Sequence, residues 1–215
     1  MGKITSFLSS LKISRDLNRT AFALLSASAV LRKEKELREI LTYLKEHKFS
    51  RRKIYEALLQ TYLFAGYPSA LLSLQTASEY FKADKALTEN PNMEQFIARG
   101  ERNCRKIYGD KYDKLIGNIS SFSPELSEWL VTEGYGKVLG RKGLSLRERE
   151  VCSIAVLASL KFESQLYSHI NGGHRTGLHW KEIEAIIDSL ALLNKNDCVK
   201  FGRKVLSSFL KRKGA

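Results

Sequence analysis

Long stretches of this chain contain no residue that breaks a helix. Proline occurs only at Pro68, Pro91 and Pro124 in 215 residues. Because proline removes a backbone donor and bends a helix, its scarcity favours long helices over many short strands. A hydrophobic content of 43% supplies a sizeable core. The sequence therefore predicts a folded, all-α protein.

The second half contains the most apolar segment. Residues 151–158 are apolar almost all round, which predicts a buried central helix, and Ser145 and Glu148 have capping-box spacing before it. A helix over about 163–175 is expected next, ended by Gly177. Its helical spacing predicts that His169 points into the core.

Other segments also have helical patterns. A stripe within 37–48 is followed by Ser50 as a predicted N-cap, and the next stripe continues to a break at 66–68. Further helices are expected at about 70–82, 93–108, 112–119 and 180–193, with Pro124 opening another. The segment 84–95 is polar and rich in turn residues, so it predicts a linker between a first module, 1–83, and a second module with a basic tail, 96–215.

The two halves are weakly similar to each other. Sliding the chain against itself places 48–54 over 177–183 and, at the same shift, Leu37 over Leu166. We call this shift the repeat offset. Hydrophobic pattern carries most of the match. The economical interpretation is an imperfect tandem repeat of one helical module.

Charge and cysteine content restrict the kind of partner. The formal net charge is +13, but basic residues alternate with acidic ones, as on solvated helix faces, except in the C-terminal group from Lys200 to Lys213. No recognition motif accompanies that group, so nucleic-acid binding is not expected.

Three cysteines without metal or redox spacing favour a reducing cytoplasm, and no apolar run is long enough to span a membrane. We expect no metal and no cofactor.

Glu150 and His169 are the strongest candidates for chemistry. Each is titratable in a mainly apolar helical context, where burial suits a group to proton transfer. An alternative remains open: Glu150 lies in an exposed, charged first turn and His169 is a satisfied core histidine.

Several segments together resemble the carboxymuconolactone decarboxylase family of the alkylhydroperoxidase D-like superfamily. They are 143–155 (GLSLREREVCSIA), the 166–177 helix and 180–187 (WKEIEAII) in the second half, with 54–59 (IYEALL) and 63–71 (LFAGYPSAL) in the first. The segments around 99–110 and 126–138 resemble that family's lead-in. The resemblance implies an all-α, alkylhydroperoxidase D-like helical bundle.

The resemblance also indicates which chemistry is absent. In the alkylhydroperoxidase D branch, two thiols react with peroxide while a Glu and a His relay protons. Aligning that His with His169 aligns the Glu with Glu150, and the thiols with Phe162 and Gln165. Phe and Gln cannot supply a thiolate, so the resemblance disfavours the two-thiol peroxidase mechanism.

The decarboxylase branch implies acid/base chemistry on a small carboxylated lactone or a similar anionic metabolite. His169 is then the general acid/base and Glu150 its orienting partner, with Arg149 or Arg175 as the carboxylate anchor. In the first module Ala21 and Ile40 take the corresponding places, so that module is expected to be structural.

Three functions compete at this stage. The leading one is a carboxy-lyase that assembles, by family resemblance, as a homotrimer of two-module chains. The others are a thiol-dependent peroxidase using Cys152, and a non-catalytic binding or assembly module of the same fold.

Overall fold

A computed structural model describes residues 2–11, 14–81, 89 and 91–214. Within those residues every regular element is a helix, which confirms the all-α prediction. The α-helices are α1 (Lys3–Ser10), α2 (Ser14–Val30), α3 (Glu34–Glu46), α4 (Arg51–Leu59), α5 (Tyr62–Ser78), α6 (Met93–Tyr108), α7 (Tyr112–Ser120), α8 (Pro124–Trp129), α9 (Leu146–Leu160), α10 (Glu163–Arg175), α11 (Trp180–Ser189) and α12 (Asn196–Lys213).

The other helical segments are not α-helices. They are the 3₁₀ turns Gly109–Lys111 and Leu190–Leu193 and a π-helix, η3, over Leu130–Val138. In the part of the chain that the structure describes, no helix is long and apolar enough to cross a membrane.

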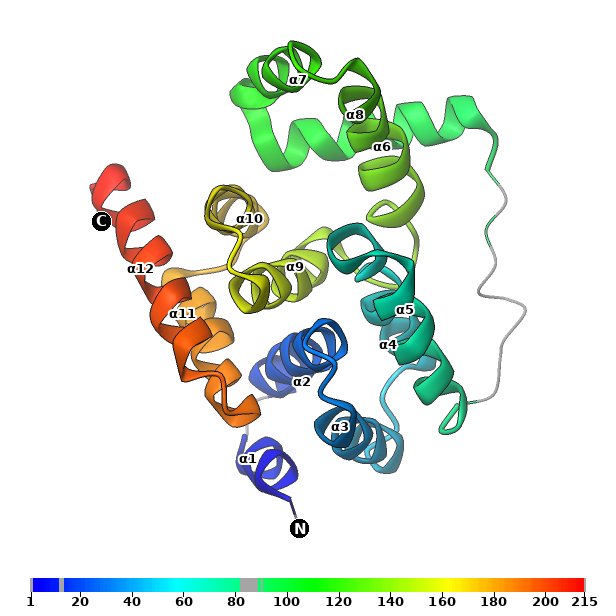
Figure 1. The fold of residues 1–215 in the computed structure, drawn as a ribbon, viewed down its shortest axis with the longest axis vertical. Helices are drawn as coiled ribbons and strands as arrows, with labels where there is room; N and C mark the ends of the chain where they lie inside the picture. The colour runs from blue at the N-terminus through cyan, green and yellow to red at the C-terminus, as the bar shows by residue number, and fades with distance from the viewer. Residues whose placement is uncertain (1, 12–13, 82–88, 90, 215) are drawn as a thin grey trace.

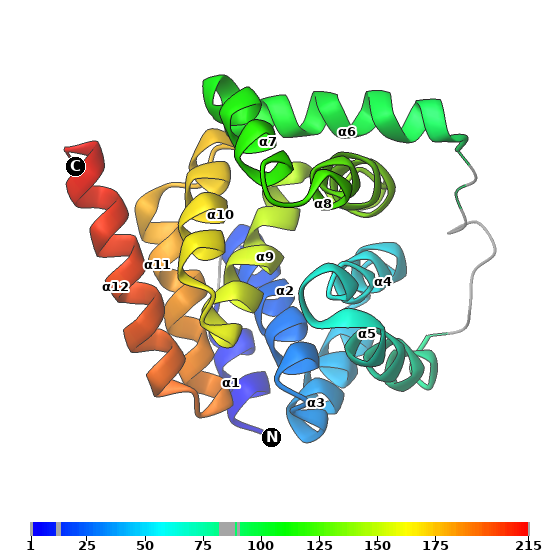
Figure 2. The same cartoon turned by 45° about the horizontal axis from the view of Figure 1, so that its top comes forward.

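Helices α2 and α9 lie side by side at the centre of the molecule (Figure 1). Helices α3, α4 and α5 flank α2, whereas α10, α11 and α12 flank α9, and α6 to α8 lie beyond α9 and α10 (Figure 2). Both central helices are buried along most of their length, so neither needs a polar face.

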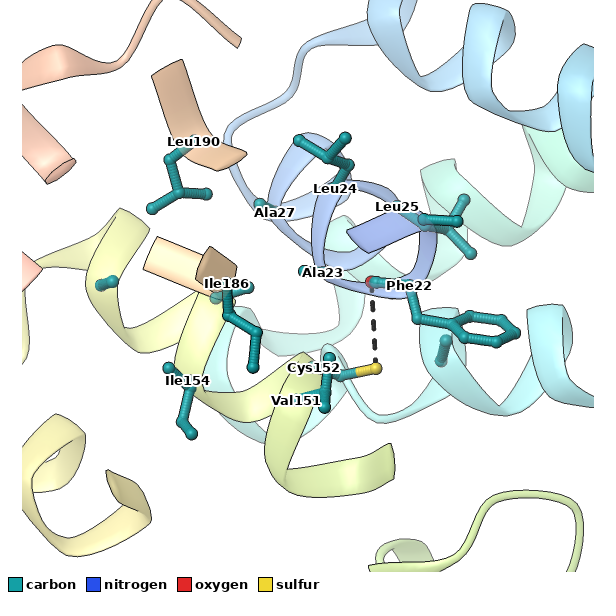
Figure 3. Packing of buried hydrophobic residues seen from close by; sticks show 14 of the residues in the cluster. Phe22, Ala23, Leu24, Leu25, Ala27, Val151, Cys152, Ile154, Ile186 and Leu190 are labelled. Carbon is teal, nitrogen blue, oxygen red and sulfur yellow. Dashed lines mark hydrogen bonds between the residues drawn. The ribbon is translucent and has the colours of Figure 1, made fainter. Parts of the chain in front are cut away.

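One hydrophobic core joins the two predicted modules. It includes Leu24 and Leu41 from the first half and Ile154 and Ile186 from the second, all fully buried. Figure 3 shows side chains of α2 and α9 in this core, with Cys152 of α9 directed toward Phe22 of α2. A smaller core, which includes Cys104 and Tyr135, lies between α6 and the π-helix. The modules therefore pack as one unit.

Capping residues predicted from the sequence begin the helices. The Ser50 side chain accepts from the Lys53 amide to begin α4, and Ser145 and Glu148 form a reciprocal capping box on α9. Gly66, with φ of 72°, interrupts α5 where a break was expected.

The predicted linker, 84–95, can be compared with the structure only in part. Residues 84–88 and 90 lie outside the described residues, and α6 already begins at Met93.

Helices recur at the same spacing in the two halves. Helices α3 and α10 begin at Glu34 and Glu163, which are separated by the repeat offset. The same offset separates two pairs of residues with positive φ, Arg32 with Lys161 and Lys48 with Gly177. These pairs lie in the turns before and after α3 and α10, so the connections recur together with the helices.

Candidate active site

Glu150 on α9 and His169 on α10 form a buried pair. His169 Nδ1 lies 2.8 Å from Glu150 Oε2, and the two residues are 7% and 2% exposed. When the carboxylate is ionised it can only accept a hydrogen bond, in which case Nδ1 is the donor and Nε2 takes no part in this contact. The alternative that Glu150 lies in an exposed first turn is wrong, because Glu150 is buried.

Glycines allow α10 to approach this pair closely. A Cβ on Gly172 would lie 3.2 Å from Glu150 Oε2 and 2.8 Å from Ile107 Cγ2. A Cβ on Gly173 would lie 3.0 Å from Leu178 Cδ1. Two glycines lower the stability of a helix, and the close packing against Glu150 and Leu178 explains why they occur in α10.

Aromatic side chains surround the pair. The Phe64 ring meets the His169 ring edge to face, with centroids 5.7 Å apart. The hydroxyls of Tyr108 and Tyr135 are 2.9 Å apart. Burial raises the pKa of each tyrosine well above its usual value, and the negative charge of Glu150 raises it further. Both tyrosines therefore stay protonated.

Sequence reasoning did not assign these aromatic residues to the site. Tyr108 and Tyr135 both belong to segments that carried the family resemblance, but Tyr135 lies in the π-helix. A π-helix does not follow the 3.6-residue period, so helical spacing could not place Tyr135 opposite Tyr108. Phe64 comes from α5, far from His169 in sequence, and no local pattern joins the two.

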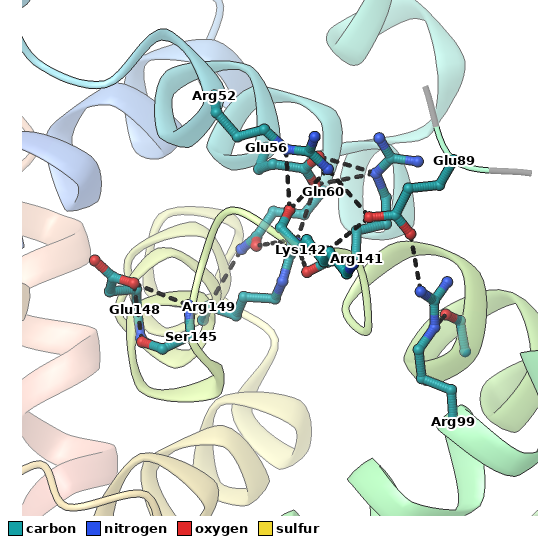
Figure 4. Close-up of polar contacts among 11 residues, drawn as sticks. Arg52, Glu56, Gln60, Glu89, Arg99, Arg141, Lys142, Ser145, Glu148 and Arg149 are labelled. Atoms are coloured by element: carbon teal, nitrogen blue, oxygen red, sulfur yellow. Dashed lines mark hydrogen bonds and ion pairs between the residues drawn. The ribbon is translucent and has the colours of Figure 1, made fainter. Parts of the chain in front are cut away.

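Arg149 is held by protein groups. Its side chain is 1% exposed, and Nη2 lies 2.9 Å from both Glu56 Oε2 and the Arg141 carbonyl oxygen. Glu56 also accepts from the Arg141 Nε, and Gln60 accepts from Arg149 Nη1 (Figure 4). This guanidinium joins α9 to α4, so we assign Arg149 a structural role in place of the predicted anchor role.

Arg175 is available to bind an anion. It is exposed near the end of α10, and its guanidinium lies against the Gly109 backbone, next to Tyr108. It has no ion pair with any described residue. Of the two predicted anchors, it is the one whose charge is not already neutralised.

No thiol occupies the expected peroxidase positions. Phe162 is 48% exposed and Gln165 is exposed. Cys152 is fully buried against the Phe22 carbonyl oxygen, and burial raises the pKa of its thiol to about 12 (Figure 3). A thiol so resistant to ionisation is a poor nucleophile at neutral pH.

No set of metal ligands occurs in the described part of the chain. Among residues 2–11, 14–81, 89 and 91–214, no group of three or more His, Cys, Asp or Glu side chains could hold a metal ion.

These features define an all-helical protein with a buried carboxylate–imidazole pair between a central helix, α9, and the helix that flanks it, α10. A sequence comparison agrees with that class: the chain is 26% identical over 97 residues to a 4-carboxymuconolactone decarboxylase from Acinetobacter baylyi. The match covers 45% of this chain and 72% of that enzyme. No protein-family model matches the chain. The chain is thus similar to the carboxymuconolactone decarboxylase family, as its motifs indicated.

Proposed function

We propose that this protein is a carboxy-lyase of the carboxymuconolactone decarboxylase type, acting on a small carboxylated lactone or a similar anionic metabolite. One observation carries the proposal: Glu150 fixes Nδ1 of His169 at 2.8 Å in a buried site. That contact orients the imidazole and leaves Nε2 as the group that transfers a proton.

The reaction needs a proton donor and stabilisation of negative charge. The bond between the ring carbon and the carboxylate breaks, carbon dioxide leaves, and the electron pair moves toward the lactone carbonyl. His169 then protonates carbon, and a proton from solvent restores the imidazolium. Glu150 stabilises that imidazolium through the hydrogen bond at Nδ1.

Tyr108 and Arg175 are proposed to contact the substrate. Hydroxyl groups that stay protonated are suitable donors to a developing oxyanion, and Tyr108 is the half-buried member of the tyrosine pair. Arg175 can bind a carboxylate through two parallel hydrogen bonds. Its exposure near Tyr108 supports this role.

We further propose that the chain consists of two modules, of which only the second carries a site. The recurring helix spacing supports this, and so does a pair of salt bridges. Arg19 contacts Glu182, and Lys53 contacts Glu148. The repeat offset carries Arg19 to Glu148 and Lys53 to Glu182, so one contact occurs twice with its charges exchanged.

Assembly and setting are also proposals. Family resemblance suggests a homotrimer of two-module chains. The three cysteines are free and buried, which supports a reducing, cytoplasmic setting.

Carbon dioxide release from 4-carboxymuconolactone tests the proposed reaction. We expect the wild-type protein to release it and His169→Gln to lose about 100-fold or more of kcat, because general acid/base catalysis typically contributes that much. His174→Gln, on the same helix, is the matched control and should retain activity.

Each other outcome contradicts part of the proposed function. Equal loss in both variants would mean that damage to α10, and not proton transfer, lowers the rate. No release by the wild-type protein would exclude this substrate and favour the non-catalytic module. Melting temperatures of both variants must stay near that of the wild type for the comparison to hold.

A further inference from the structure

A cavity lies outside the proposed active site. It has a volume of about 410 Å³ and is lined by the first turns of α2 and α9, with Leu178 and Glu182 closing it from the side of α11. Glu150 and His169 do not line it. Whatever binds there is therefore held by different side chains.

Three arginines surround this cavity. The Arg19 side chain is 10% exposed, and although its terminal nitrogens contact Asp16 and Glu182, its Nε is buried without a hydrogen-bond partner. Nε of Arg147 is buried without a partner in the same way. Arg15 is exposed and has no ion pair with a described residue. Because both Nε atoms are inaccessible to solvent, a ligand in the cavity would contact the exposed guanidinium of Arg15 and the exposed part of Arg147, whose side chain is 29% exposed.

The acidic groups of the cavity are already neutralised. Glu182 forms salt bridges with Arg19 at 2.8 Å and with Arg147 at 2.7 Å, and Glu148 forms one with Lys53. Arg15 therefore remains as uncompensated positive charge at the mouth. The N-terminal ends of α2 and α9 add to the positive potential there.

One wall of the cavity is apolar. It is formed by Phe22, Val151 and Leu178, which are 2%, 4% and 2% exposed. Figure 3 shows Phe22 and Val151 on the facing helices α2 and α9. An apolar wall opposite a cationic rim suits a molecule with an apolar body and one anionic head.

We propose that this cavity binds a small carboxylate with an apolar body, at a site separate from Glu150 and His169. The guanidinium groups of Arg15 and Arg147 hold the carboxylate, and the apolar wall holds the body. The carboxylate accepts hydrogen bonds from the exposed guanidinium nitrogens of these two arginines.

Benzoate is the probe, titrated into the purified chain by calorimetry. We expect saturable binding that weakens about tenfold or more in Arg15→Gln, as expected for loss of one charge-assisted contact. Asn18→Phe, which places a ring in the cavity, should weaken binding similarly. The matched control is Arg51→Gln, an exposed arginine in the first turn of α4, and it should bind as the wild type does.

The remaining variants and probes distinguish the alternatives. His169→Gln should leave benzoate binding unchanged, so a failure of the proposed active site does not affect this test. Benzyl alcohol should bind more weakly than benzoate, and so should inorganic phosphate, which has no apolar body. The proposal is overturned if benzoate does not bind, if Arg15→Gln and Asn18→Phe leave binding unchanged, or if only His169→Gln abolishes it.

Discussion

Two regions of this molecule have helices at matching positions along the sequence but different interiors. In the region of α9 and α10, Glu150 and His169 form a buried polar pair beside Gly172. In the region of α2 and α3, the positions that correspond by the repeat offset are Ala21 and Ile40, both fully buried. One interior is filled by apolar side chains, whereas the other retains two titratable groups.

This difference suggests that the polar pair is not required by the fold. A buried ion pair contributes little net stability, because desolvation cancels most of the attraction. If one helical framework can be filled with Ala and Ile, the pair in the other is better explained by chemistry.

The largest expected effect comes from breaking the pair. His169→Leu leaves a buried carboxylate without its partner and should lower the free energy of unfolding by about 3 to 5 kcal/mol. Glu150→Met combined with His169→Leu makes this interior apolar like the first, and should be neutral or raise stability by about 1 to 4 kcal/mol. Urea denaturation measures both. A double variant less stable than the single one would break the comparison.

A smaller loss of stability is expected from replacing Gly172, which packs closely against Glu150. Gly172→Ala should cost about 1 to 3 kcal/mol, because its methyl group meets Ile107 and Glu150 at short range. Gly117→Ala on α7 has no atom within 4 Å and should instead stabilise by about 0.4 to 1 kcal/mol. Thermal unfolding separates the two signs. A stabilising Gly172→Ala would show that close packing does not account for this glycine.

The smallest effect concerns the salt bridges of Glu182, with Arg19 from the first half and Arg147 from the second. Burial disfavours ionisation of Glu182, but hydrogen bonds from the His179 backbone and Arg147 outweigh it, so the pKa of Glu182 is below its ordinary value of 4.5. The resulting stability is fully present above that value and is lost as pH falls through the folded-state pKa. In Arg147→Gln the stability lost toward acid pH should be smaller than in the wild type, by less than about 1 kcal/mol.

Melting temperatures of Arg147→Gln and the wild type between about pH 3 and pH 6 check this sign. The two curves should converge toward acid pH. Curves that diverge there would contradict the assignment.

Local signals predicted much of the fold. The bounds of α6 and α10 match the predicted 93–108 and 163–175, because turn residues and caps mark their ends. Helix α2 was not predicted as an element, since its buried positions run without interruption from Thr20 to Val30 and leave no polar stripe to set a helical period.

The candidate site was predictable only where one segment determines it. Spacing within α10 placed His169 in the core, and the structure agrees. Arg149 was predicted to anchor a substrate because a guanidinium can bind a carboxylate through two hydrogen bonds, and its structural partner Glu56 lies 93 residues away in sequence. Long-range ion pairs leave no local pattern, so a buried structural arginine and a substrate anchor look alike in sequence.

The most direct test of the central claim is a double-mutant cycle in kcat/KM for decarboxylation of 4-carboxymuconolactone. It uses Glu150→Gln, His169→Gln and the double variant, each checked for a wild-type melting temperature. If the pair transfers protons as one unit, the double variant should be no slower than His169→Gln alone. Losses in kcat/KM that multiply in the double variant, or a wild-type kcat/KM no higher than that of His169→Gln, would contradict the claim that the pair acts as one unit.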